Sequence, residues 1–205
     1  MLYYGGNMNK ITDIYKKRRS IYALGNTISI TDKELISIIE NCLLHAPSAF
    51  NSQSGRIVLL LGNEHKKLWE IALKTLAPIA IPEKFTTTEL KIASFASGYG
   101  SILFFEDDKI IADLQKKYPL YKDAFFPFSY QSSGMLQYMV WTALASKNIG
   151  ASLQHYNPLI DDSVKKYWEI PENWRLISQL PFGNIEAPAE NKQFASLEQR
   201  IKIFK

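Results

Sequence analysis

Two consecutive arginines followed by a serine form the clearest candidate for an anion-binding site. Arg18, Arg19 and Ser20 stand just before the apolar residues 21–24. Guanidinium groups make bidentate, charge-assisted hydrogen bonds to phosphate oxygens, each worth roughly 1.5 to 3 kcal/mol when partly shielded from water. Two other interpretations stay open at this point. The preceding lysines are also compatible with a solvated basic helix end or, with the interleaved tyrosines, with a nucleic-acid-binding patch.

Residues 47–55, called the amide loop below, carry two side chains suited to a heterocyclic ligand. A proline, small residues and a glycine keep this segment out of regular structure. The amides of Asn51 and Gln53 both donate and accept hydrogen bonds, which suits the pyrimidine end of a flavin. Turn formation alone also explains Asn51, so both interpretations remain open.

A third polar segment, Gln154-His155-Tyr156, follows the most apolar helix that the sequence predicts. Extended backbone at this place can face a cofactor ring, with Tyr156 or His155 stacked beside it. A lone histidine in an apolar neighbourhood is more often a packed core residue than a catalyst. We therefore expect no catalytic side chain here.

An aromatic cluster precedes that helix and consists of Phe125, Phe126, Phe128 and Tyr130. Such side chains can stack on a planar substrate and so form the roof of its pocket. Packing in the core explains the same cluster equally well.

Metal centres and disulfides are not expected. Cys42 is the only cysteine, on the apolar face of a predicted helix, and His45, His65 and His155 lack ligand spacing. No apolar run approaches the roughly 18 residues of a membrane span, and the start of the chain lacks a secretory pattern. These observations predict a cytoplasmic protein that uses no metal.

The elements that position these residues follow from hydrophobic periodicity. Thr31 and Glu34 form a capping box, which predicts a helix that ends before Pro47. No glycine-rich dinucleotide motif opens a helix after a strand, so a mixed α+β sandwich is favoured over a Rossmann fold. We expect one domain over residues 1–205, with residues 1–8 as an extension outside the fold. The other predicted elements are a buried central strand at 57–61, strands at 101–105 and 174–182, helices at 64–76, 110–118, 135–144 and 161–168, and mostly loop after Pro82.

Taken in order, several motifs of the chain resemble those of the nitroreductase family, in particular its short branch of compact homodimers. The resemblance extends from about Lys10 to Phe204, and the order and spacing of the motifs carry it together. The matching segments are residues 18–24 (RRSIYAL), 45–54 (HAPSAFNSQS), 98–100 (GYG), 103–107 (LFFED), 134–137 (GMLQ), 141–144 (WTAL), 150–158 (GASLQHYNP) and 181–183 (PFG).

This resemblance implies an α/β/α sandwich with a mainly antiparallel central sheet, assembled as a homodimer that binds FMN at its interface. Arg18 and Arg19 would bind the phosphate with Ser20 beside them, helped by a basic residue of the C-terminal tail. Arg200 is the first candidate for that residue and Lys192 the second. The ring would lie between Asn51 and Gln53 on one side and Gln154, His155 and Tyr156 on the other, with Lys91 at its polar edge.

The implied activity is an NAD(P)H-dependent nitroreductase or quinone reductase. Hydride would pass from NADH or NADPH to FMN and then, in a ping-pong sequence, to nitroaromatics, quinones or related electron-poor acceptors. A flavin-binding regulatory or storage protein with little turnover is the first alternative, and a nucleic-acid-binding protein is the second. The residues leave open the physiological acceptor and the choice between the two nicotinamides.

Overall fold

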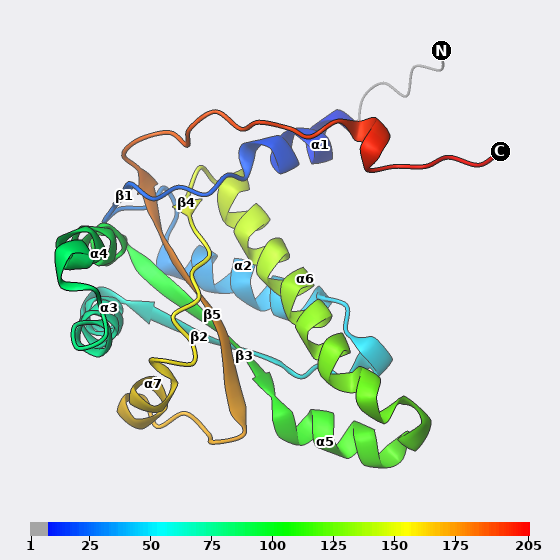
Figure 1. The fold of residues 1–205 in the computed structure, drawn as a ribbon. Coiled ribbons are helices and arrows are strands. Elements are labelled where there is room, and N and C mark those ends of the chain that lie inside the picture. Colours follow the sequence, from blue (N-terminus) through cyan, green and yellow to red (C-terminus); the bar gives the residue numbers. More distant parts are fainter. Residues whose placement is uncertain (1–7) are drawn as a thin grey trace.

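An open antiparallel sheet forms the middle layer of the computed structural model, which describes residues 8–205 (Figure 1). The strand order is β1-β5-β3-β2, and β4 also pairs with β5. This arrangement confirms the expected α+β class and the mainly antiparallel sheet. The strands are β1 (Leu24–Gly25), β2 (Gly55–Leu61), β3 (Gly100–Asp107), β4 (Gly150–Ala151) and β5 (Trp174–Ile185).

Strand β3 is the central strand and is buried along its whole length. It pairs with β2 on one side and with β5 on the other. Strand β2 stands at the end of the strand order and only Leu60 in it is buried. The expectation of a buried central strand at residues 57–61 is therefore wrong, because an apolar run also suits a strand that a helix covers on one face.

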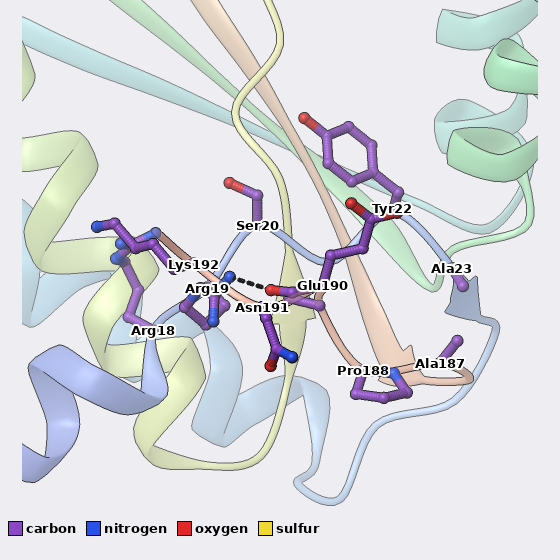
Figure 2. Close-up of a pocket in the computed structure, with 11 residues that line it drawn as sticks. Arg18, Arg19, Ser20, Tyr22, Ala23, Ala187, Pro188, Glu190, Asn191 and Lys192 are labelled. Carbon is purple, nitrogen blue, oxygen red and sulfur yellow. Dashed lines mark hydrogen bonds between the residues drawn. The ribbon is translucent and has the colours of Figure 1, made fainter. Parts of the chain in front are cut away.

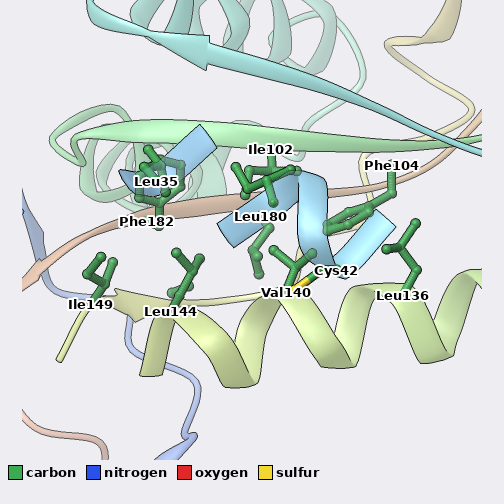
Figure 3. Packing of buried hydrophobic residues seen from close by; sticks show 12 residues of the cluster. Leu35, Cys42, Ile102, Phe104, Leu136, Val140, Leu144, Ile149, Leu180 and Phe182 are labelled. Atoms are coloured by element: carbon green, nitrogen blue, oxygen red, sulfur yellow. The ribbon is translucent and has the colours of Figure 1, made fainter. Parts of the chain in front are cut away.

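Helices cover both faces of the sheet. On one face, α2 (Asp32–His45) and α6 (Phe125–Ser146) pack against β3 and β5. Figure 3 shows Leu136, Val140 and Leu144 of α6 pointing towards the strands, with Cys42 of α2 in the same cluster. The buried position of Cys42 confirms that it is a core residue. The expected capping box is present, since Thr31 and Glu34 each accept the other's backbone N–H.

The opposite face is covered by α3 (Gly62–Leu76), α4 (Pro82–Ala96) and α7 (Asp161–Tyr167). Helix α4 lies where loop was expected. Three consecutive threonines, which are weak helix formers, obscured its pattern, while Ile92 and Phe95 supply its buried contacts. Pro82 is tolerated because it stands in the first turn, where its missing N–H is not needed.

Helix α6 begins ten residues earlier than the predicted 135, at Phe125. Pro127 stands in its first turn, so it does not interrupt the helix. The remaining elements are α1 (Met8–Lys17), α5 (Asp108–Lys117) and three short 3-10 helices, η1 (Ala49–Asn51), η2 (Pro119–Ala124) and η3 (Leu197–Gln199). The predicted N-terminal extension otherwise lies outside the described residues, and Met8 already belongs to α1.

Candidate functional site

A basic pocket, called the arginine pocket below, forms where the N-terminal segment meets the C-terminal tail (Figure 2). It encloses about 660 Å³. Ser20 forms a bridge with Ala151 of β4, and the backbone N–H of Ile21 donates to the carbonyl of Ala151 over 2.9 Å. These bonds attach the N-terminal segment to the sheet. The lining of the arginine pocket consists of Arg18, Arg19, Ser20, Tyr22, Ala23 and residues 187–192.

The charges of the arginine pocket are not balanced within the described part of the chain. Neither Arg18 nor Arg19 forms an ion pair with a described residue, and Lys192 adds a third cation. Arg19 donates to the backbone carbonyl of Glu190, whose carboxylate is the one acidic group in the lining. Uncompensated guanidinium groups around a cavity suit a dianionic phosphate ester.

Arg18 is positioned by aromatic rings of α6. Its guanidinium carbon lies 4.3 Å from the ring centre of Trp141 and 6.0 Å from that of Tyr138. Its Nε is buried and has no hydrogen-bond partner in the structure. A half-buried cation that is stacked but unpaired differs from the exposed Lys16 and Lys17 beside it. The interpretation as a solvated helix end therefore describes the lysines and not the arginines.

The amide loop has a strained and well-anchored backbone. Phe50, Asn51 and Gln53 have positive φ angles of 56°, 50° and 48°. Residues other than glycine rarely adopt this conformation, and they do so where surrounding contacts hold it. Ser48 accepts the backbone N–H of Gln53 over 3.0 Å, and Ser132 of α6 accepts that of Ala49 over 3.3 Å. The side chains of Asn51 and Gln53 are exposed and have no hydrogen-bond partner among residues 8–205.

The arginine pocket and the amide loop lie at different places along α6. Arg18 stacks on Trp141, whereas the amide loop is bound to Ser132. These two helix positions are about 14 Å apart along the axis at 1.5 Å per residue. Figure 1 shows the two segments towards opposite ends of α6.

The segment Gln154-His155-Tyr156 runs beside β5. Gln154 is buried and exchanges backbone hydrogen bonds of 2.7 and 2.9 Å with Gln179. The Tyr156 ring is half-buried and forms a T-shaped pair with Trp69, and burial raises the pKa of its hydroxyl to about 12. His155 is the exposed side chain of the three. The segment therefore offers backbone and one imidazole to a ligand.

The predicted basic partners occupy three different places. Lys192 lines the arginine pocket, whereas Arg200 follows η3 in the exposed tail and is not part of that lining. Lys91 lies on α4 with its ammonium group 5.9 Å from the ring centre of Phe95. The structure thus brings Lys192, and not Arg200 or Lys91, to the two arginines.

The aromatic cluster at the start of α6 divides between core and surface. Phe125 is buried, while Phe126 and Tyr130 are exposed and Phe128 is half-buried. The guanidinium carbon of Arg175 lies 5.0 Å from the ring centre of Phe126 and 4.6 Å from that of Tyr130. Phe126 and Tyr130 are thus available to a ligand, whereas Phe125 acts in packing.

One polar residue of this region was missed by the sequence analysis. Glu106 lies in β3 and is fully buried, and it accepts a hydrogen bond of 2.6 Å from Ser54 of the amide loop. Burial raises the pKa of its carboxyl group to about 7, although Ser54 opposes that shift. An acidic residue at the end of an otherwise apolar strand was the available signal.

Two further findings apply to residues 8–205 as a whole. No group of three or more histidine, cysteine, aspartate and glutamate side chains there is arranged to hold a metal ion. None of the described helices combines the length and the apolar character that crossing a membrane requires.

Comparison with known proteins decides the family. A sequence model described as the nitroreductase family matches residues 15–184. The chain belongs to the nitroreductase family. The expected resemblance is thereby confirmed, and so is the expected fold.

Individual nitroreductases support this assignment. The nitroreductase FRM2 of Saccharomyces cerevisiae is 33% identical over 198 residues, which cover 93% of this chain and 93% of that protein. The nitroreductase CinD of Lactococcus lactis, solved in complex with chloramphenicol, superposes with a TM-score of 0.85 at 43% identity, over 95% of this chain and all of that one. A nitroreductase with bound FMN from Desulfitobacterium hafniense gives a TM-score of 0.72 at 17% identity, over 97% and 100% of the two chains, which shows the shared fold.

The buried carboxyl group of Glu106 gives a prediction about stability. Its pKa is about 7 in the folded chain and about 4.5 in an unfolded one, so the folded state binds the proton more tightly. The free energy of unfolding that this group contributes is fully present below pH 4 and is lost as the pH rises through 7. The loss amounts to about 3 kcal/mol. Glu106→Gln, which keeps the shape without the charge, should therefore melt higher than the unmodified protein at pH 8.5.

Thermal denaturation at pH 5 and pH 8.5 tests this expectation. The gain in melting temperature should shrink or vanish at pH 5, where both proteins carry a neutral side chain. An equal shift at the two pH values would contradict the assigned titration.

Proposed function

We propose that this nitroreductase is an FMN-dependent oxidoreductase that transfers electrons from NADH or NADPH to nitroaromatics, quinones or related electron-poor acceptors. The observation that carries the proposal is the arginine pocket, whose three cations form no ion pair within residues 8–205. The complexes of CinD with chloramphenicol, with 4-nitrophenol and with nicotinic acid support small aromatic substrates. The FMN bound in the Desulfitobacterium hafniense protein supports the cofactor.

The arginine pocket would hold the phosphate of FMN. Arg18 and Arg19 supply charge and bidentate donors, Ser20 adds a hydroxyl, and Lys192 closes the pocket from the tail. Arg200 is the other candidate for a phosphate ligand from the tail, and it would reach the arginine pocket if the tail folds differently in a homodimer. When bound, FMN accepts and donates hydride equivalents. The chain itself therefore has to bind the cofactor, orient the substrate and exclude water.

The amide loop would bind the ring through Asn51 and Gln53. Their free side-chain amides suit the alternating donors and acceptors of the pyrimidine edge. Within one chain this loop and the arginine pocket lie towards opposite ends of α6, so we infer that a second copy presents its amide loop to the cofactor. A homodimer follows from that inference.

Exposed apolar side chains support the homodimer independently. A soluble monomer rarely leaves a large contiguous apolar surface uncovered. Here the C-terminal tail and the outer sides of α2 and α6 carry such side chains. They are Ile36, Leu43, Leu44, Met135, Tyr138, Phe194, Leu197, Ile201, Ile203 and Phe204.

The remaining predicted residues would surround the ring and its substrate. His155, with the backbone of Gln154 and Tyr156, would line one side, and Lys91 would add positive charge at an edge. Phe126, Phe128 and Tyr130 would stack on planar acceptors, whereas Phe125 supports them from the core. The cytoplasmic location stays a prediction.

Replacing Arg18 tests the phosphate site. Arg18→Ala should weaken FMN binding by about tenfold or more, because it removes charge-assisted hydrogen bonds to the phosphate. Titration of flavin fluorescence against the apoprotein measures the dissociation constant. Lys16→Ala is the matched control, since Lys16 is exposed on the same segment and lies outside the pocket. Equal affinities of Arg18→Ala and the unmodified protein would refute the placement.

Phe126→Ala tests the aromatic roof. The substitution should raise KM for large acceptors by about threefold to tenfold, because one stacking face worth roughly 0.5 to 1.5 kcal/mol is lost. Steady-state kinetics over a panel of one-ring and two-ring acceptors measures it, with Leu120→Ala, an exposed residue of η2, as control. Unchanged KM values across the panel would argue against the roof.

A further inference from the structure

Glu106 occupies an unusual position beneath the amide loop. It is fully buried near the end of β3, opposite Gly55 of β2 and Arg175 of β5. Its Oε2 accepts the hydrogen bond from Ser54, whereas its Oε1 has no partner in the structure. A cavity of about 240 Å³ lies next to it, lined also by Gln53 and Leu136. Burying a carboxyl group costs free energy unless its oxygens find hydrogen-bond partners, so the contacts of Glu106 call for a functional explanation.

The contacts of Glu106 and its neighbour converge on the amide loop. Asp107 donates its backbone N–H to the carbonyl of Ser54 over 2.9 Å. Arg56 donates to the carbonyl of Gln53 over 2.8 Å and pairs with the Asp107 carboxylate at 2.9 Å. The end of β3 therefore holds the loop through a side chain and through its backbone. Of the two held residues, Gln53 has a positive φ angle itself and Ser54 follows it directly.

We propose that Glu106 is a positioning residue for the cofactor. Its carboxyl group fixes Ser54 and thereby holds residues 50–53 in the strained conformation that presents the amides of Asn51 and Gln53. Glu106 itself does not touch the ligand. This inference rests on the proposed function, since it assigns the presented amides to the flavin ring.

None of the described charged groups around Glu106 forms an ion pair with it that would fix its ionisation state. Arg56 faces it from β2, Arg175 from β5 and Asp108 from the start of α5. Arg56 is engaged by Asp107 and Arg175 by Asp108, so neither arginine is dedicated to Glu106. Helices α2 and α6 present apolar side chains and a serine to this cavity.

The same geometry makes the loop sensitive to pH. With a pKa of about 7, Glu106 is ionised above neutral pH and protonated below it. Burial favours the neutral form of Glu106, so its ionisation disfavours the packed arrangement in which it accepts the Ser54 hydroxyl. The amide loop is therefore held more firmly at pH 6 than at pH 8.5, and flavin binding should follow.

Riboflavin and FMN titrations at pH 6 and pH 8.5 test the proposal. Riboflavin carries the ring without the phosphate, so its affinity reports on the amide loop and not on the arginine pocket. The unmodified protein should bind riboflavin about fivefold more tightly at pH 6 than at pH 8.5. Glu106→Gln, which stays neutral and still accepts the Ser54 hydroxyl, should keep the tighter affinity at both pH values, whereas Ser54→Ala should show the weaker affinity at both.

Asp113→Asn provides the matched control, because Asp113 is an exposed carboxylate on α5. It should keep the pH dependence of the unmodified protein. Glu106→Gln with the pH dependence of the unmodified protein, or Ser54→Ala with its affinity, would overturn the proposal while leaving the proposed function intact. An unmodified protein that binds no FMN would overturn both.

Discussion

Strand β3 is buried on both faces and paired along both edges, and the rest of the structure is arranged around that constraint. Each of its faces needs an apolar cover, which α2 and α6 provide on one side and α3 and α4 on the other. The backbone N–H and C=O groups of β3 are shielded from water and must find hydrogen-bond partners in the protein. Strands β2 and β5 therefore run along the length of β3. The layers of the sandwich follow from this single strand.

The same constraint places the arginine pocket and the amide loop. Strand β5 continues past β3 and also pairs with β1 and β4. Residues 20 and 21 are attached to β4 at Ala151. The arginine pocket therefore sits at one end of the sheet. At the other end, Glu106 and Asp107 close β3 and hold the amide loop before β2 begins. One sheet thus places the arginine pocket at one end and the amide loop at the other, and α6 runs between them.

Local signals in the sequence predicted much of this arrangement. The capping box at Thr31 and the apolar periodicity of α2 and α3 depend on residues close together in the sequence, so they could be predicted from it. The paired arginines were predicted to be an anion site for the same reason, and that role stays a prediction. Helix α4 was missed because its threonines are weak helix formers and its stability comes from burying Ile92 and Phe95 against another helix.

Long-range properties could not be predicted in the same way. Whether β2 is central or at the edge depends on which strands pair, and an apolar run alone does not say. The approach of Lys192 to the arginines depends on how the tail folds back over more than 170 residues of chain. The burial of Glu106 likewise follows from packing by α6, which the residues of β3 do not reveal.

The central claim is that this chain binds FMN through the arginine pocket and the amide loop. The most direct measurement is the flavin content of the purified protein after incubation with excess FMN and gel filtration. We expect flavin absorbance in the protein peak at a ratio of about one FMN per chain. A protein peak without flavin absorbance would contradict it.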